Sequence, residues 1–448
     1  MESTTQSTTT SKLDQELSDK RVRFLKDFQN GQSKQWTIVM GNEAGDLDSL
    51  ASSIGYSYFA SSSLFIPLQL TPRTDLYLRP ENLESLSQSK ISLSSLLTID
   101  DLEGKQAQLE SNYVLVDHNS LLPSFRSSSS QEEDRVVSII DHHVDERQHL
   151  SASPRLINLV GSCSSLITTH FFQQQQPELE PPKELADLLI KTVLIDTRLK
   201  PVEKNGKATP IDLKAVSLLL PFSSFPRTTT TTTTTTNIGE GKEEEVGVFD
   251  KVGQDTLSSL KETGEFLIKL KEEVSWMNGR DLLRRDYKEY TTEVEGSLKY
   301  GLSTVPLGLN VWLDKFEKED SDKRLSEGVL KDIRNWMKER ELKLCGVLTS
   351  YNHLKKNGEF GKHRRELLIL TNELKFDKVF EGLELDQVLQ LEEWKLVDQY
   401  GGVDRGGERQ GGESYERWKV WQQGNTKATR KQVAPVLKDL INQALSLK

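Results

Sequence analysis

The apolar positions in the first half of the chain form short continuous runs at 37–40, 64–70, 113–116 and 136–140. These runs have the length of β-strands and lack polar residues at alternate positions, which is typical of strands that are covered on both faces. Pro67 lies inside the second run and indicates an edge strand, because proline has no amide hydrogen to donate to a neighbour. Between the runs the apolar residues follow helical spacing, and we expect helices near 13–24, 50–58, 81–110, 185–195 and 249–270.

The second half of the chain repeats this mixture of strands and helices. Strands are expected at 298–305, 342–350, 366–371 and 415–422, and helices at 325–341 and 431–447. The alternation predicts an α/β fold, with a mainly parallel sheet in the first domain. A chain of 448 residues exceeds one ordinary core, so two domains are expected. The predicted parts are a polar tail with a short helix (1–34), a first domain (35–278) and a second domain (279–448), with a hinge near 275–279.

The composition adds a polar insertion to this division. Hydrophobic residues make up 35% of the chain, and long polar tracts explain the low value. One tract contains an unbroken threonine run, Thr228–Thr236. Such a tract cannot fill a core, so residues 226–246 are predicted to be a disordered surface insertion.

The net charge of −10 and the pI near 5.5 argue against general nucleic-acid binding. Cys163 and Cys345 match no metal spacing and fit a reducing compartment. The N-terminus has no apolar signal region, and no run reaches the roughly 20 apolar residues of a membrane span. We therefore expect a monomeric cytoplasmic protein with neither membrane nor nucleic-acid partners.

Acidic and histidine residues gather directly after the predicted strands. Because parallel strands end at one edge of a sheet, these side chains should meet where open α/β sheets bind ligands. For the first of these turns alone, a helix cap at Asp48 is an alternative interpretation. The residues concerned are Asp46 and Asp48, Asp117 and His118, and Asp141, His142 and His143, and Asp196 adds a carboxylate at the end of the predicted helix 185–195.

Carboxylates in such proximity repel one another, and divalent cations relieve the repulsion. Asp46, Asp48, Asp117 and Asp196, together with imidazoles, suit a pair of divalent cations, an arrangement that recurs in phosphoryl hydrolysis. Oxygen and imidazole ligands without thiolates favour Mg, Mn or Co over structural Zn. The sequence has no Gly-rich phosphate loop with the Walker spacing.

Basic residues are available to bind phosphate. Lys200, Lys204 and Lys207 follow Asp196, although their spacing alone indicates a solvated basic loop. In the second domain, basic residues lie at 362–365 and 427–431 and could contact phosphate oxygens.

These motifs together resemble a known family. The turn 41–49 and the endings Asp-His-Asn (117–119) and Asp-His-His (141–143) resemble the DHH phosphoesterase superfamily. Residues 283–288, and Arg430-Lys431 before Pro435, resemble its DHHA2 branch, which holds family II inorganic pyrophosphatases, prune proteins and fungal-type cytosolic exopolyphosphatases. The resemblance covers 35–448 apart from the Thr-rich insertion. It implies a DHH domain and a DHHA2 domain, both α/β, that close over an active-site cleft.

The resemblance also implies roles for the matching residues. Two divalent cations are expected, Mg first and Mn or Co as alternatives, with Asp117 bridging them. Asp46 and Asp117 hold one metal, with Asn42 at the position where pyrophosphatases have a histidine, and Asp48, Asp117, His142 and Asp196 hold the other. His118 and His143 contact phosphate or support the ligands, and Arg430, Lys431, Arg365 and Lys207 bind substrate phosphates.

Details within the branch favour one activity. Prune proteins usually show Asp-His-His and then Asp-His-Arg at the two strand endings. This chain has Asp-His-Asn and then Asp-His-His, which is the order of the exopolyphosphatases. Family II pyrophosphatases are shorter and have the histidine that Asn42 replaces. We therefore expect an exopolyphosphatase that releases orthophosphate from inorganic polyphosphate. The alternatives are a pyrophosphatase or prune-like nucleotide phosphodiesterase, and a catalytically weak interaction protein, which the intact ligand set argues against.

Overall fold

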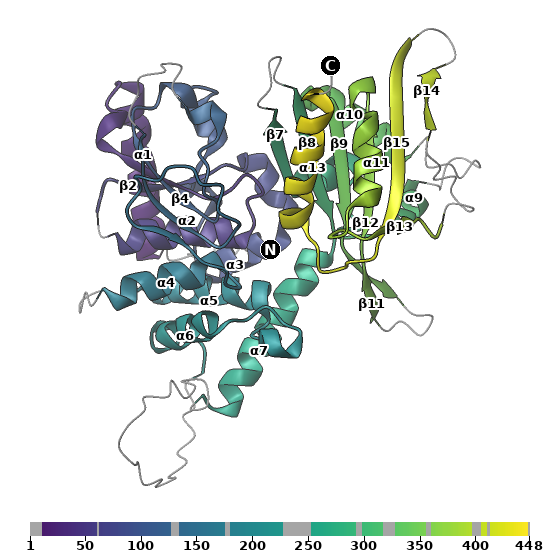
Figure 1. The fold of residues 1–448 in the computed structure, drawn as a ribbon. Helices are drawn as coiled ribbons and strands as arrows, with labels where there is room; N and C mark the ends of the chain where they lie inside the picture. The colour runs from purple at the N-terminus through teal and green to yellow at the C-terminus, as the bar shows by residue number, and fades with distance from the viewer. Residues whose placement is uncertain are drawn as a thin grey trace, which may run out of the picture. The chain divides into compact units, whose positions relative to one another are not determined.

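Two large sheets organise the chain in the computed structural model (Figure 1). The chain divides into two compact units, Met1–Lys271 and Glu272–Lys448, and each unit has its own sheet and hydrophobic core. Among the residues that the structure describes, no helix is both long and apolar enough to cross a membrane. The described residues are 11–60, 62–126, 134–174, 180–226, 252–292, 298–316, 328–354, 360–396, 405–409 and 413–446. Thr228–Thr236 lies outside them, so the disordered insertion stays a prediction.

The first unit contains a six-stranded sheet in the order β3-β2-β1-β4-β5-β6, and all of its strand pairs are parallel. This confirms the predicted fold class. The prediction of an edge strand from Pro67 is wrong, because β2 lies between β1 and β3. However, β3 pairs only with Leu68 and Gln69, so Pro67 has a neighbouring strand on one side only. The strands are β1 (Thr37–Met40), β2 (Phe65–Gln69), β3 (Leu97–Thr98), β4 (Asn112–Val116), β5 (Val136–Asp141) and β6 (Arg155–Ile157).

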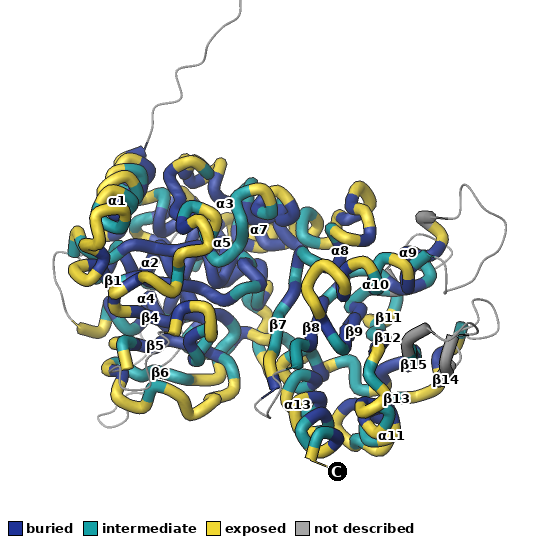
Figure 2. The backbone as a smooth tube through the Cα atoms, turned by 90° about the horizontal axis from the view of Figure 1, so that it is seen from above, coloured by how far each residue is buried: buried dark blue, intermediate teal, exposed yellow. Residues whose placement is uncertain are grey.

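The strands of this sheet are apolar without alternation because both faces are buried. On β1, Val39 packs into a core with Leu50 of helix α2 (Leu47–Phe59), whereas Ile38 and Met40 pack into a second core with Phe24 of helix α1 (Lys12–Gln29). Figure 2 shows the burial of α2 along most of its length. The helices of this unit are α1 (Lys12–Gln29), α2 (Leu47–Phe59), α3 (Pro80–Gln88), α4 (Cys163–Gln173), α5 (Lys183–Thr197), α6 (Pro210–Leu219) and α7 (Gln254–Glu272), the last of which ends across the division.

Two helix predictions need correction. The helix after the first strand begins at Leu47, and its N-cap is Asp46, whose side chain accepts a hydrogen bond from the Ser49 amide. The alternative of a cap at Asp48 is therefore wrong. The long helix predicted at 81–110 is also wrong, since α3 ends at Gln88 and short 3-10 turns follow. Glu103 and Gly104 have positive φ values of 52° and 74°, which a right-handed helix cannot contain.

The second unit contains a sheet in the order β13-β15-β12-β9-β8-β7, with β14 paired to β15. Only the pair β8 and β9 is parallel among the paired strands that the structure describes in this sheet. The predicted strands at 298–305, 342–350, 366–371 and 415–422 correspond to β8, β9, β12 and β15. The strands are β7 (Tyr287–Thr291), β8 (Lys299–Val305), β9 (Leu344–Thr349), β10 (Tyr351–Leu354), β11 (Phe360–Arg364), β12 (Glu366–Thr371), β13 (Leu391–Glu393), β14 (Arg405–Arg409) and β15 (Glu413–Gln423), where β10 and β11 form a separate hairpin. The helices are α8 (Gly279–Arg285), α9 (Leu309–Phe316), α10 (Val329–Arg340), α11 (Asp377–Leu385) and α13 (Arg430–Ser446).

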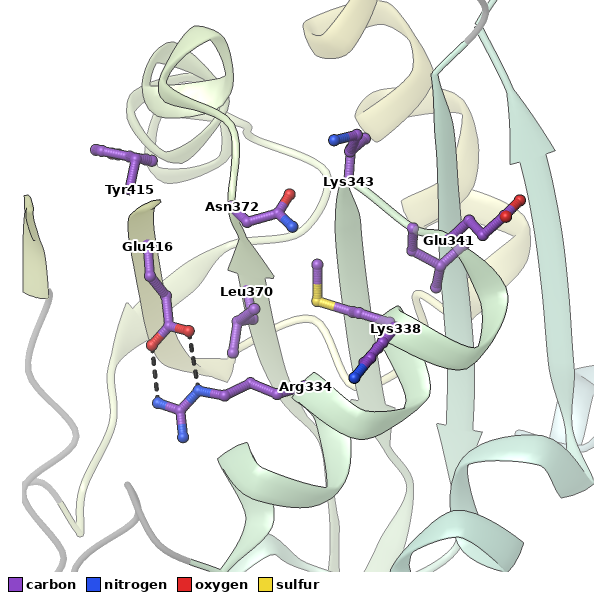
Figure 3. A pocket seen from close by; sticks show the side chains of 10 residues that line it. Arg334, Lys338, Glu341, Lys343, Leu370, Asn372, Tyr415 and Glu416 are labelled. Carbon is purple, nitrogen blue, oxygen red and sulfur yellow. Dashed lines mark hydrogen bonds and ion pairs between the residues drawn. The ribbon is translucent and has the colours of Figure 1, made fainter. Parts of the chain in front are cut away.

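A hollow of about 360 Å³ lies in the second unit, between α10 and the strands β12 and β15 (Figure 3). Met337 and Leu370 are among the residues that line it, and Arg334 and Glu416, which also line it, form an ion pair. None of the residues predicted to bind metal or substrate lines it.

Candidate metal centre

Most of the predicted metal ligands lie at the carboxyl ends of three neighbouring strands, and Asp196 lies near the end of α5. β1 leads into a turn that ends at Asp46, the N-cap of α2, and Asp48 lies in the first turn of that helix. β4 ends directly before Asp117, and β5 ends at Asp141, directly before His142. Because β1, β4 and β5 are adjacent and parallel, they bring together residues that are far apart in the sequence.

Asp117 holds a central position in this cluster. Its backbone φ is +61°, a left-handed conformation that is uncommon for residues other than glycine. Its Oδ2 accepts hydrogen bonds from Asn42 Nδ2 at 2.7 Å and from Ser49 Oγ at 2.6 Å. Its Oδ1 lies 3.1 Å from His142 Nε2 and 3.5 Å from His143 Nδ1. The protein thus fixes one carboxylate oxygen by hydrogen bonds and places the other beside two imidazoles.

The donor set around Asp117 fits a divalent cation. Asp117, His142 and His143 each offer one ligand atom, and these atoms all lie within 4.8 Å of one another. Oδ1 of Asp117 is buried and accepts no hydrogen bond from any described residue. Burial, followed by the negative charge of Asp46, raises the pKa of Asp117 to about 6. A cation would remove both the desolvation cost and the repulsion between carboxylates.

Asp48 is held by the first turn of α4. Its Oδ1 accepts hydrogen bonds from Ser162 Oγ at 2.9 Å and from the Ser164 amide at 2.9 Å, and its Oδ2 accepts one from the Cys163 amide at 2.7 Å. Amides at a helix N-terminus favour a carboxylate. Oδ2 also lies 3.7 Å from His142 Nε2, so Asp48 belongs to the same cluster. Its role as a metal ligand stays a prediction.

Asp46 and Asp196 lie among the same charged residues, but their pKa values shift in opposite directions. Burial raises the pKa of Asp46, but the charges of Arg79 and Lys271 and the Ser49 amide outweigh burial and lower it well below the usual range. Burial and the charge of Asp48 raise the pKa of Asp196 well above the usual range, and its buried Oδ2 accepts no hydrogen bond from described residues.

Asn42 contacts Asp117 twice. Its Nδ2 donates to Oδ2 of Asp117 and, at 3.1 Å, to the Asp117 carbonyl, while its Oδ1 accepts from the Ala44 amide at 2.9 Å. The described contacts of Asn42 thus orient Asp117, and its predicted role as a metal ligand stays a prediction.

The histidines of the two strand endings are oriented by nearby acceptors. His143 Nδ1 lies 2.8 Å from Asp141 Oδ1, and Asp141 Oδ2 accepts from Asn119 Nδ2 at 2.5 Å. His118 Nδ1 lies 3.0 Å from the Val116 carbonyl. A carboxylate behind an imidazole fixes the orientation and tautomer of the ring.

The predicted phosphate-binding residues fall into both units. Lys207 is exposed and lies in the first unit, between α5 and α6. In the second unit, Arg365 Nε donates to the Thr426 carbonyl at 2.9 Å, and Arg430 donates to the Asp286 carbonyl at 2.8 Å and to its carboxylate at 2.7 Å. Lys431 is exposed at the start of α13.

Sequence analysis did not find the residues that support this cluster. Arg79 is buried and donates to the Ala44 carbonyl at 2.6 Å, so it holds the turn before Asp46. Ser49, Ser162 and Ser164 hold the carboxylates. Small hydroxyl residues before an apolar segment signal a helix start at 162–165, but no local pattern identifies Asp48 as their partner.

Known proteins resemble this chain over both units. The model of the DHH family, N-terminal domain, matches residues 36–192, and the model of the DHHA2 domain matches residues 265–440. A Schizosaccharomyces pombe protein named "Putative exopolyphosphatase" is 30% identical over 430 residues, covering 92% of this chain and 92% of that protein. Mouse "Exopolyphosphatase PRUNE1" is 27% identical over 292 residues, covering 63% of this chain and 55% of that protein.

More distant similarity extends to pyrophosphatases. A Streptococcus equi subsp. zooepidemicus protein named "Probable manganese-dependent inorganic pyrophosphatase" is 27% identical over 164 residues, covering 36% of this chain and 48% of that protein. The crystal structure of a Methanococcus jannaschii protein, described as a "putative family II inorganic pyrophosphatase", aligns with a TM-score of 0.51 at 19% identity, covering 91% of this chain and 99% of that chain. This last likeness concerns the fold alone. Because the similarity to the S. pombe protein spans nearly all of both chains and both models match, this chain belongs to the DHH family, with a DHH domain followed by a DHHA2 domain.

Proposed function

We propose that this chain is an exopolyphosphatase that hydrolyses the terminal phosphoanhydride bond of inorganic polyphosphate and releases orthophosphate. The similarity to proteins named as exopolyphosphatases and pyrophosphatases indicates a metal-dependent phosphoanhydride hydrolase. The proposal adds that the substrate is polyphosphate. The observation that carries the proposal is the buried Oδ1 of Asp117, which accepts no hydrogen bond from described residues and lies beside His142 and His143.

The proposed cofactors are two divalent cations, with Mg favoured and Mn or Co as alternatives. Asp117 would bridge them, and the other ligands would be Asp46 with Asn42 on one side and Asp48, His142 and Asp196 on the other. Bound cations would polarise phosphoryl oxygens and make an attacking water more acidic.

The residues of the chain would position the reactants around this centre. In the proposed step, water attacks the terminal phosphorus and loses a proton as its O–P bond forms, and the anhydride P–O bond breaks so that the bridging oxygen leaves with the shortened chain. The Asp141 carboxylate, 2.8 Å from His143 Nδ1, fixes the imidazole ring, so that His143 is proposed to contact a phosphate oxygen or move a proton. His118 has the same proposed role. Arg430, Lys431, Arg365 and Lys207 are proposed to bind the phosphates of the substrate.

The second candidate function is inorganic pyrophosphatase, favoured by the streptococcal relative. Phosphate release from long-chain polyphosphate, tripolyphosphate and pyrophosphate, measured side by side with Mg and with Mn, tests both. We expect the highest kcat/KM on long-chain polyphosphate. A preference for pyrophosphate would replace the proposal with the second candidate, and no hydrolysis of any of the three would refute both.

A further inference from the structure

A loop with four exposed basic residues directly follows the metal-site residue Asp196. This basic loop, residues 198–209, carries Arg198, Lys200, Lys204 and Lys207, all exposed, against one acidic residue, Glu203. No described residue forms an ion pair or a hydrogen bond with the side chains of Arg198, Lys200 or Lys204. In a chain with a net charge of −10, such a local group of unpaired cations is a candidate site for a polyanion.

The basic loop has a fixed backbone. The Ala208 amide donates to the Lys200 carbonyl at 2.9 Å, and the Gly206 amide donates to the Pro201 carbonyl at 2.9 Å. Asn205 has a positive φ of 59°. Gly206 packs so closely on Lys200 that a Cβ atom there would overlap its backbone. The loop therefore presents its lysines from a defined scaffold.

Hydrogen bonds connect the basic loop to the residues that hold Asp48. The Asp212 carboxylate accepts hydrogen bonds from the Ser162 amide at 3.2 Å and from the Thr209 amide at 2.7 Å. Ser162 in turn donates its hydroxyl to Asp48. The Asp212 carboxylate therefore connects the end of the basic loop to Ser162, one of the residues that hold Asp48. A Cβ atom on Gly161 would lie 2.9 Å from the Lys207 carbonyl, which shows how closely the loop approaches the start of α4.

We propose that Lys200 and Lys204 form a distal subsite for the phosphates of a polyphosphate chain beyond the bond that is cleaved. The inference rests on the proposed function and adds a basis for chain-length preference to it. Every phosphate of the polymer carries negative charge, so extra lysine contacts strengthen the binding of long chains. Pyrophosphate has one phosphate on each side of the bond that is cleaved, so it has no further phosphate to place in the distal subsite. The subsite should therefore affect KM for long chains and leave kcat unchanged.

The test compares the double variant Lys200→Ala/Lys204→Ala with wild type on long-chain polyphosphate, tripolyphosphate and pyrophosphate. For long chains we expect KM to rise roughly fivefold or more, with kcat unchanged. For pyrophosphate we expect a change of less than about twofold. The dependence of log KM on log salt concentration for long chains should become shallower by about 1.4, or about 0.7 for each lysine removed.

The matched control is Lys34→Ala/Lys105→Ala, which removes two exposed lysines that precede β1 and β4, at the amino ends of the strands and away from the metal site. This control should keep the KM of wild type for every substrate. Lys204→Ala alone tests the subsite if the double variant does not fold. An unchanged ratio of KM values between long-chain and short substrates would overturn the subsite while wild-type hydrolysis of polyphosphate upholds the proposed function. A wild-type protein without activity on polyphosphate would refute both.

Discussion

Asp117 combines three features that are costly for folding. It is buried, its backbone is left-handed at φ +61°, and its Oδ1 accepts no hydrogen bond from described residues. Such features persist where the surrounding structure enforces them, and here Asn42 and Ser49 hold the other oxygen. A residue placed in this way is suited to act as a ligand rather than as a structural carboxylate.

Asp117→Asn should therefore lower hydrolysis by more than about 100-fold at every metal concentration, because excess cation cannot restore a lost bridging charge. Phosphate release over a series of Mg and Mn concentrations measures the effect, and calorimetric titration of Mn reports binding directly. Recovery to the wild-type rate at high Mg would show that Asp117 does not bridge.

The raised pKa of Asp117, about 6 in the metal-free protein, predicts a pH dependence of metal binding. Protons compete with the cation below this pKa, so the Kd for Mn should be about tenfold weaker at pH 5 than at pH 7. Isothermal titration at the two pH values measures this change. Equal affinities at both values would contradict the assignment of Asp117 as a ligand.

The same pKa predicts the sign of a stability change without metal. The folded state holds the Asp117 proton more tightly than the unfolded state does. Its contribution is fully present below the unfolded pKa near 4, and it is lost as the pH rises through about 6. Between these values the metal-free wild type should lose up to about 3 kcal/mol relative to Asp117→Asn. Urea unfolding of both proteins across this range checks the sign.

Asn42→His should raise the affinity for Mn or Co relative to Mg, because imidazole suits transition metals better than an amide oxygen does. The present amide orients Asp117 through two hydrogen bonds, so turnover should also slow. Parallel activity titrations with Mg and Mn test the substitution. If the two proteins share one metal preference, residue 42 lies outside the coordination sphere.

At the residue scale, the sequence indicates where the predicted ligands lie but not which residues hold them in place. Asp117 and His142 follow buried apolar strands, and this position alone predicts where they meet. Ser162 and Ser164 hold Asp48 across more than a hundred positions, and only folding creates that contact. Polar side chains that act through tertiary hydrogen bonds leave no periodic pattern.

At the scale of elements, the start of α4 decides whether Asp48 is held. Gly161 precedes this helix, and a Cβ atom there would lie 2.8 Å from Asp212 Oδ2 and 2.9 Å from the Lys207 carbonyl. Gly161→Ala should therefore displace the helix start, cost about 1–3 kcal/mol, and weaken metal binding. Gly264→Ala, in α7, is the matched control, because its Cβ atom would lie 3.4 Å from Leu194 of α5, an ordinary van der Waals distance. Chemical denaturation should show Gly264→Ala to be as stable as wild type or more so.

The predictability of elements depended on how their residues are buried. The strand expected at 366–371 agrees with β12 at both limits, because its six residues are buried and four of them, Leu367–Leu370, form a continuous apolar run. The helical spacing of 81–110 does not reveal the left-handed residues that interrupt a helix there, which are Lys90 directly after the C-cap residue of α3 and then Glu103 and Gly104. Short elements such as β6 and β13 carry too few residues for a periodic signal.

At the scale of the whole molecule, the candidate metal ligands all belong to Met1–Lys271, and Glu272–Lys448 has a separate core. A cation that binds only the folded first unit stabilises that unit by mass action, by about 2.7 kcal/mol at a hundredfold excess over Kd. Adding Mn to the metal-free protein should therefore slow hydrogen exchange in α2 and β4 and change it little in β9 and β12. Asp117→Asn should remove the effect. Equal slowing in β12 would show that the cation also stabilises the second unit, and no slowing in β4 would place the metal elsewhere.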